Sequence, residues 1–197
     1  MRYDASHKDE TRRKVLKAAA RAIRAQGPFK VGVAGVMSDA GLTHGGFYAH
    51  FASKDDLVAA GVTQMFDETA TRFERVTEGL DGPEAVAAYI DFYLSALHRD
   101  SRVSGCPLPF LAADAPRLPE LARQAFAEGV AGMHERMAAR LAAIGRRDPT
   151  GDAKSLLAEM VGALALARAD PDPIRSDAIL AASRAALKAR FNLELMS

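Results

Sequence analysis

Apolar residues recur every three or four positions along most of this chain, which is the spacing of a helix with one buried face. Strict alternation of apolar and polar positions, the pattern of a strand, is almost absent. Glycine, proline and clustered polar residues divide the helical pattern into segments. These segments predict helices over residues 6–26, 33–40, 43–51, 53–78, 83–97, 110–111, 119–144, 153–169 and 173–191. The predicted fold class is all-α.

Several predicted helix ends carry residues that favour them. Ser53 and Asp56 form a capping box, whose side chains can satisfy backbone N–H groups at the start of a helix. Pro83 suits the first position of the next helix, and Gly41 can end the short helix before it in a turn. The clearest predicted loop is GRRDPTGD, at residues 145–152.

The stretch LTHGGFYAHF, at residues 42–51, is unusual for a helix because it begins with paired glycines and crowds aromatic rings together. If Thr43 is the N-cap and each residue turns the helix by about 100°, Phe47 and Phe51 share one face. Leu42 can pack on Phe47 as a hydrophobic staple. The two phenylalanines are therefore predicted to point inward.

The opposite face of this segment carries almost no side chain, since it consists of Gly45, Gly46 and Ala49. Tyr48 and His50 project from its flanks. A face this bare lets the backbone approach a large partner closely, and the major groove of DNA admits one helix. The preceding short helix and the turn complete a helix-turn-helix. The alternative is that the glycines mark a loop and the aromatic residues belong to the core.

Charge is unevenly distributed, although the formal net charge is only +1. Residues 1–60 hold ten Lys and Arg against six Asp and Glu, a balance of +4, which leaves −3 for residues 61–197. The basic N-terminal third favours a nucleic-acid or other anionic partner, although such an excess is also ordinary on a solvated face.

Composition limits the cellular setting. A single cysteine cannot form an intramolecular disulfide, and the charged start of the chain has no apolar region typical of a signal peptide. The longest uninterrupted apolar run, Met160–Ala167, is much shorter than the roughly 20 residues that span a bilayer. We therefore expect a soluble cytoplasmic protein without a membrane partner.

The run VAGVMSDAGLTHGGFYAHFASKDDL, at residues 33–57, resembles the N-terminal DNA-binding domain of TetR-type transcriptional regulators. The shared features are the turn glycine, the Thr cap, the small pair, the Phe-Tyr-x-His-Phe run and the Ser-Lys-Asp-Asp-Leu start of the next helix. The resemblance covers about residues 9–60 well. It implies a helix-turn-helix domain at residues 1–52 and a helical effector-binding and dimerisation domain at residues 53–197. It also implies a homodimer, usually a repressor, that a small molecule releases from double-stranded operator DNA, with no cofactor.

Carried over residue by residue, the resemblance also implies DNA contacts. Lys54 lies where the family typically reaches a phosphate. Two positions depart from the family pattern: Gly32 replaces a frequent Ser or Thr before the second helix, and His44 replaces a frequently basic residue. The remaining implied contacts are Thr43, His44, Gly46, Tyr48, Ala49 and His50.

Aromatic and apolar residues on the middle helices predict a cavity for a small-molecule effector. An aromatic stripe at helical spacing is also the ordinary pattern of a core, so each of these residues could instead belong to the core. His98 and His134 receive no predicted role. The candidate lining residues are Phe66, Phe73, Tyr89, Phe92, Tyr93, Phe110 and Met133.

Cys106 is a further candidate for the cavity. It lies just before a predicted short helix, whose dipole favours a reactive thiolate, and Arg99 and Arg102 are near it in sequence. If the thiol lines the cavity, an electrophile or oxidant could modify it and change DNA binding. The alternative is that Cys106 is a small buried hydrophobic residue.

The last two predicted helices favour a dimer surface. The first is apolar on nearly all sides, through residues such as Leu164. The second carries a stripe of mostly small apolar residues that includes Ile179. Four such helices, paired across a two-fold axis, would bury a shared core. The alternative is a core within one chain.

Other functional classes receive little support from the sequence. His44 and His50 are six residues apart, about 240° around a helix, and cannot converge on a metal ion. No glycine-rich phosphate loop or nucleophile elbow is present, so we do not expect an enzyme. The remaining alternative is a helical protein-interaction bundle without DNA binding, which a DNA-binding assay would distinguish.

Overall fold

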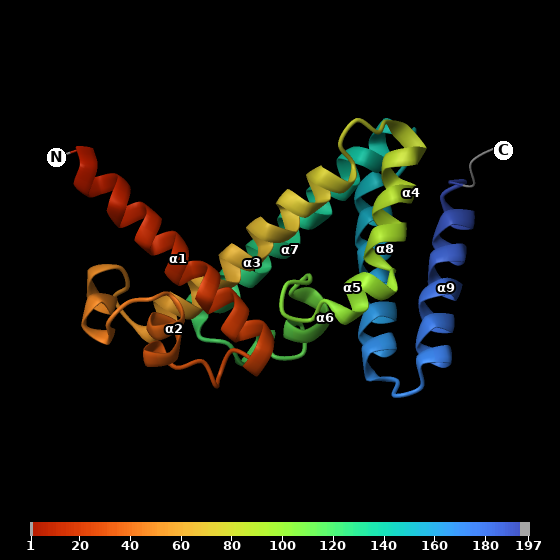
Figure 1. Ribbon diagram of the computed structural model, residues 1–197. Coiled ribbons are helices and arrows are strands. Elements are labelled where there is room, and N and C mark those ends of the chain that lie inside the picture. The colour runs from red at the N-terminus through yellow and green to blue at the C-terminus, as the bar shows by residue number, and fades with distance from the viewer. Residues whose placement is uncertain (1, 194–197) are drawn as a thin grey trace. The chain divides into compact units, whose positions relative to one another are not determined.

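Helices are the only regular elements that the computed structural model describes, over residues 2–193, with side chains from residue 8 onward (Figure 1). This confirms the predicted all-α class. None of the described helices has the length and hydropathy needed to cross a membrane. In chain order the elements are α1 (Arg2–Gln26), α2 (Val33–Asp39), the 3₁₀-helix η1 (His44–Ala49), α3 (Lys54–Val76), α4 (Gly82–Tyr93), α5 (Ala96–Asp100), α6 (Leu108–Leu111), the 3₁₀-helix η2 (Ala115–Arg117), α7 (Glu120–Ala143), α8 (Pro149–Ala169) and α9 (Pro173–Arg190).

The described chain divides into two units, each with its own packing. The first contains the residues up to Glu68 together with Phe110–Gly129, and the second contains Thr69–Pro109 together with the residues from Val130 onward. This division differs from the predicted boundary after residue 52. Residues 53–68 belong to the first unit because the first half of α3 packs on α1.

Close packing of α1 and α3 organises the first unit. A Cβ added at Gly61 would lie 2.7 Å from the terminal Cδ1 of Ile23, so the Ile23 side chain fills the space that Gly61 leaves between the two helices. Further along the same helices, the Arg24 guanidinium donates to the Glu68 carboxylate at 2.7 Å, with only 2% of the Arg24 side chain exposed. A buried arginine needs such a partner, and this pair therefore helps to hold α1 and α3 in register.

Local signals set several helix ends as predicted. The Asp56 N–H donates to Oγ of Ser53 at 3.1 Å, which confirms the capping box at the start of α3. Gly41 has a φ of +73°, a left-handed conformation that suits glycine, and it ends α2.

Other helix ends differ from the prediction. The backbone is helical from Arg2, so Ser6 does not begin α1. The predicted loop at 145–152 is shorter, because Oδ1 of Asp148 accepts from the Gly151 N–H and caps a helix that begins at Pro149. The helix predicted over 83–97 is two helices. Its break follows Tyr93, where Oγ of Ser95 accepts from the His98 N–H and starts α5.

In the second unit, α8 and α9 lie side by side along most of their length (Figure 1). The short connection between them ends at Asp172, whose side chain accepts from the first N–H groups of α9. Leu164 of α8 is 0% exposed, so it belongs to the core of its own chain. The residues that α8 buries are Ala153, Leu156, Leu157, Met160, Ala163, Leu164 and Ala167.

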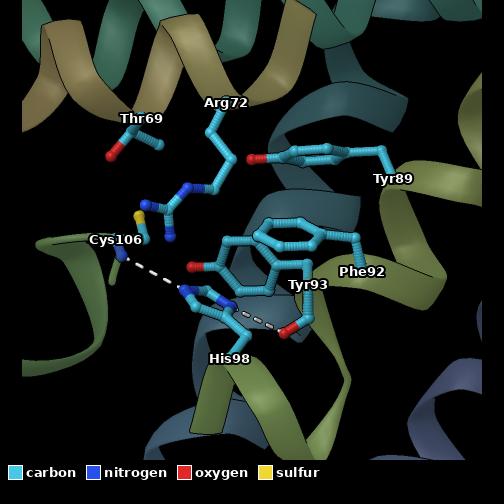
Figure 2. A pocket seen from close by; sticks show the side chains of 7 residues that line it. All are labelled: Thr69, Arg72, Tyr89, Phe92, Tyr93, His98 and Cys106. Carbon is cyan, nitrogen blue, oxygen red and sulfur yellow. Dashed lines mark hydrogen bonds between the residues drawn. The ribbon is translucent and has the colours of Figure 1, made fainter. Parts of the chain in front are cut away.

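His98 fastens the segment after α5 to the end of α4. The Cys106 N–H donates to Nε2 of His98 at 3.1 Å, and Nδ1 of the same ring lies 2.8 Å from the carbonyl oxygen of Tyr93 (Figure 2). Since Nε2 accepts a hydrogen bond, the neutral ring carries its proton on Nδ1 and donates it to that carbonyl. Burial lowers the pKa of His98 to about 4, the hydrogen bond to Tyr93 partly opposes this, and the charges of Arg168 and Arg72 lower it further.

We predict that His98 makes the stability of the fold pH-dependent. The unfolded chain takes up a proton near pH 6.5 that the folded protein accepts only near pH 4, so stability present above pH 6.5 falls as the pH approaches 4. The loss is roughly 3 kcal/mol in the free energy of unfolding. Urea unfolding at a series of pH values measures it. His98→Asn should be less stable at pH 7 but should lose less stability on acidification.

The matched control for this prediction is His44→Gln, which removes an exposed histidine. If the unfolding free energy depends on pH in the same way in wild type and His98→Asn, the pH dependence does not come from His98.

Candidate functional site

The segment around η1 has one buried side and one exposed side. Phe47 and Phe51 are each 2% exposed, and their rings stack with centroids 5.7 Å apart. Their inward direction is as predicted. Tyr48, in contrast, is 73% exposed, and its ring meets the edge of Phe47. An exposed tyrosine supported in this way holds its hydroxyl outward at little cost in side-chain entropy.

The local conformation is a 3₁₀-helix, not the predicted α-helix. Thr43 has extended backbone angles but makes no capping hydrogen bond with its side chain. Paired glycines are poor α-helix formers, and a 3₁₀-helix turns by about 120° per residue, so the predicted faces shift. Gly46 is half-buried, and a Cβ added to it would lie 3.7 Å from Cε of Met37. Gly45 is the glycine that faces outward, with no atom within 4 Å of an added Cβ.

Two basic side chains near this segment donate to backbone carbonyl groups. The Arg12 guanidinium donates to the carbonyl oxygen of His50 at 2.6 Å and lies 4.6 Å from the centre of the Phe51 ring. Nζ of Lys54 donates to the carbonyl oxygen of Phe29 at 3.3 Å and remains exposed. The sequence analysis did not identify Arg12, because no local spacing relates it to a segment almost forty residues away.

The predicted DNA-contacting residues are not equally exposed. His50 is half-buried, and its Nδ1 is buried without a hydrogen-bond partner among the described residues. His50 is therefore less available for a DNA contact than its predicted place on the flank of the helix implied. Its neighbours on the outer side of the segment are exposed. The exposed members of the predicted set are Thr43, His44, Tyr48, Ala49 and Lys54.

A separate pocket lies in the second unit and encloses a volume of about 10 Å³, roughly the space of one water molecule. Figure 2 shows aromatic rings from α4 on one side and the Arg72 side chain reaching from α3 on the other. Four predicted residues, Tyr89, Phe92, Tyr93 and Cys106, come together here. That they bind an effector stays a prediction. The complete lining is Thr69, Arg72, Tyr89, Phe92, Tyr93, His98 and Cys106.

The other predicted cavity residues do not line this pocket. The ring of Phe73 packs on Tyr89 with centroids 4.6 Å apart, outside the lining, and Met133 is buried. Phe66 and Phe110 belong to the first unit, where Phe66 packs on Phe126. Phe66, Phe73 and Met133 are buried, as the core alternative for an aromatic stripe requires, whereas Phe110 is half-buried.

Three lining residues were missed by sequence reasoning. Thr69 and Arg72 are one turn apart on α3, where a polar spacing of three is also typical of a solvated face. No sequence pattern around His98 distinguishes a core histidine from a pocket histidine. Only the packing of α3, α4 and α5 brings the three residues together.

Burial keeps most of the pocket uncharged. It is the main cause that raises the pKa of both Tyr89 and Tyr93, and the neighbouring Cys106 raises both pKa values further. The neutral state of His98 follows from its low pKa. No carboxylate is among the lining residues, whereas Arg72 contributes a permanent positive charge.

Cys106 does not have the activated environment that its sequence position implied. It is 4% exposed, and α6 is a single turn of four residues, which has little dipole to lower a thiol pKa. Arg99 is directed elsewhere, since its guanidinium pairs with Asp100 and Asp177. The thiol is a buried pocket residue.

Residues 15–60 match the family model described as bacterial regulatory proteins of the tetR family. This range contains α2, η1 and the residues that hold them. A comparison with curated proteins gives no match.

Solved structures of similar fold cover nearly the whole chain. The reduced form of NemR from E. coli is 23% identical, with a TM-score of 0.78 over 91% of this chain and 96% of that one. A TetR transcriptional regulator from Chloroflexus aurantiacus has the same identity and TM-score, over 93% and 95% of the two chains. A TetR-family regulator from Cytophaga hutchinsonii is 18% identical, with a TM-score of 0.78 over 92% and 94%. At these identities the likeness establishes the fold.

Residues 15–60 therefore match the N-terminal domain of the tetR family, and the described chain shares the all-helical fold of solved TetR-type regulators.

Proposed function

We propose that this protein is a ligand-responsive transcriptional repressor that binds an inverted-repeat operator as a homodimer. The observation that carries the proposal is the exposed, side-chain-poor face of η1 within the residues that match the tetR family. Buried Phe47 and Phe51 hold the segment from behind, so that face is free to enter a major groove.

Each exposed residue of this face has a specific role in the proposal. Gly45 and Ala49 let the backbone approach the base edges, and the Ala49 methyl group can contact a thymine methyl group. Thr43 and His44 offer hydrogen-bonding groups to bases. Tyr48 and Lys54 bind phosphates, which fix the register of the protein on DNA.

Dimerisation is proposed through the outer faces of α8 and α9. Leu166 of α8 is 63% exposed, although it lies on a helix that is otherwise well packed. Leu164, the residue first expected at this surface, is buried within its own chain. Ile179 is half-buried, and the exposed residues beside it on α9 are mostly alanines, which let helices approach closely. The exposed alanine and glycine residues of the two helices are Ala158, Gly162, Ala169, Ala178, Ala181, Ala182, Ala185, Ala186 and Ala189.

Effector binding is proposed at the pocket of the second unit. A ligand releases DNA if it binds more tightly to the conformation that does not fit two successive major grooves. The proposal keeps Tyr89, Phe92, Tyr93 and Cys106 as effector contacts and adds Thr69, Arg72 and His98.

Selection of bound sequences from random DNA should recover an inverted repeat. We predict that two protein variants bind this repeat more weakly, each in a different way. Lys54→Gln should weaken binding and flatten the slope of log affinity against log salt by about 0.9 for each protomer, because one phosphate contact is lost. Tyr48→Phe should weaken binding without changing that slope, because no charge is lost. Fluorescence anisotropy with labelled duplexes at several salt concentrations measures both effects.

Recovery of no DNA sequence at all would contradict the repressor proposal and favour the helical interaction bundle. An unchanged salt slope in Lys54→Gln would contradict the phosphate role of Lys54.

A bulky side chain at Gly45 provides a steric test. Gly45→Leu should reduce operator affinity by about tenfold or more, because the new side chain lies on the face that enters the groove. No protein atom lies within 4 Å of the first added carbon, so circular dichroism should show wild-type helix content. Gly45→Ala, the smaller change, should produce a smaller loss. Equal affinity in wild type and Gly45→Leu would show that another surface contacts DNA.

A charge at Leu166 tests the dimer. Leu166→Glu should give a monomer in light scattering and lose affinity for the full operator, because both half-sites must be read together. Leu121→Glu, at a leucine of α7 that is 54% exposed, is the matched control and should remain dimeric. If Leu166→Glu is still a dimer, the interface lies elsewhere.

A further inference from the structure

We propose that the pocket of the second unit recognises a small, planar organic carboxylate, with the Arg72 guanidinium as its partner. This inference rests on the proposed function in taking the pocket as the effector site. It adds the chemical class of the effector.

The positive charge of the half-buried Arg72 side chain has no acidic partner among the described residues. Among the described residues, none forms a hydrogen bond or ion pair with the Arg72 guanidinium, which lies 5.9 Å from the centre of the Phe92 ring. Arg168, the nearest comparable cation, donates to the carbonyl oxygens of Arg99 and His98 at 3.0 and 2.9 Å. Arg72 therefore retains its full set of donors, and a carboxylate accepts two of them in parallel.

The Tyr93 hydroxyl group is buried without a strong partner. Tyr93 is 0% exposed, and its hydroxyl oxygen has no nitrogen or oxygen partner among the described residues, so its neighbour is the Cys106 thiol, a weak hydrogen-bonding group. Figure 2 shows the hydroxyl groups of Tyr89 and Tyr93 pointing to the same side as the Arg72 guanidinium. A buried hydroxyl without a strong partner is unfavourable, and a carboxylate oxygen would remove that cost by accepting its hydrogen bond.

Other polar groups of the pocket do not compete for the ligand. Both ring nitrogens of His98 are already hydrogen-bonded, one to the Tyr93 carbonyl and one to the Cys106 N–H. No lining residue carries a negative charge that would repel a carboxylate. A single free guanidinium matches a monoanion better than a phosphate dianion, which would require a second unpaired cation.

The apolar part of the pocket is aromatic. The ring centroids of Tyr89 and Phe92 lie 6.2 Å apart at an interplanar angle of 36°, and those of Tyr89 and Tyr93 lie 5.9 Å apart at 54°, so tilted aromatic rings form this side of the pocket. The enclosed volume of about 10 Å³ is far below the roughly 300–1,000 Å³ typical of pockets for drug-sized ligands, so a ligand must displace the half-buried Arg72 side chain or the rings to enter. A short, flat aromatic or conjugated acid requires the smallest such displacement.

Isothermal titration calorimetry with benzoate and crotonate, each compared with its uncharged amide, tests the proposal. At least one carboxylate should bind wild type about tenfold or more tightly than its amide, because only the anion pairs with Arg72. Arg72→Gln should remove that preference, whereas Arg72→Lys should keep part of it. Tyr93→Phe should weaken carboxylate binding, because it removes the hydroxyl donor.

Arg75→Gln is the matched control, since Arg75 is an exposed arginine on the same helix. Circular dichroism of each variant checks that it is folded. If neither carboxylate is preferred over its amide, if the preference survives in Arg72→Gln, or if inorganic phosphate binds wild type as tightly as both acids, the proposal is wrong.

The operator assay separates this proposal from the proposed function. Operator binding without any carboxylate preference would overturn the ligand class and leave the repressor proposal intact. A carboxylate preference that depends on Arg72, in a protein that binds no DNA sequence, would support the ligand class and overturn the repressor proposal.

Discussion

Helix α3 packs on α1 where Gly61 faces Ile23 and Ala19: an added Cβ would lie 2.7 Å from the terminal Cδ1 of Ile23, which would have to shift, and 3.4 Å from Cβ of Ala19. This close approach buries the apolar faces of both helices and brings Arg24 within hydrogen-bond distance of Glu68. The first helix then supports α2 and provides Arg12, which fastens the end of η1. A face with almost no side chains can be held rigidly in this way, because its support comes from behind.

The pocket in the second unit follows a different physical principle. Its rings pack as an ordinary aromatic core, and burial keeps the tyrosines and His98 in their neutral forms. A core needs nothing more for stability. An unpaired guanidinium and a buried hydroxyl without a strong partner add nothing to packing, which is why they indicate ligand binding more strongly than the aromatic residues do.

The comparisons with known proteins bear unequally on the two candidate sites. The family match covers residues 15–60, which include η1 and Lys54, whereas the pocket is lined by residues between 69 and 106. Solved structures at 18–23% identity share the fold over that second region but do not specify what it binds. The ligand class therefore depends on the side chains of this chain alone.

The sequence by itself determined the all-α class, the Ser53 cap, the turn at Gly41 and the inward direction of Phe47 and Phe51, because each depends on residues within about one helical turn. Tertiary structure decided that η1 is a 3₁₀-helix, that a helix breaks before Ser95 and that Leu164 is buried within one chain. It also joined Thr69, Arg72 and His98 in one pocket. Contacts between residues far apart in the chain leave no periodic signal, since they depend on how whole helices pack.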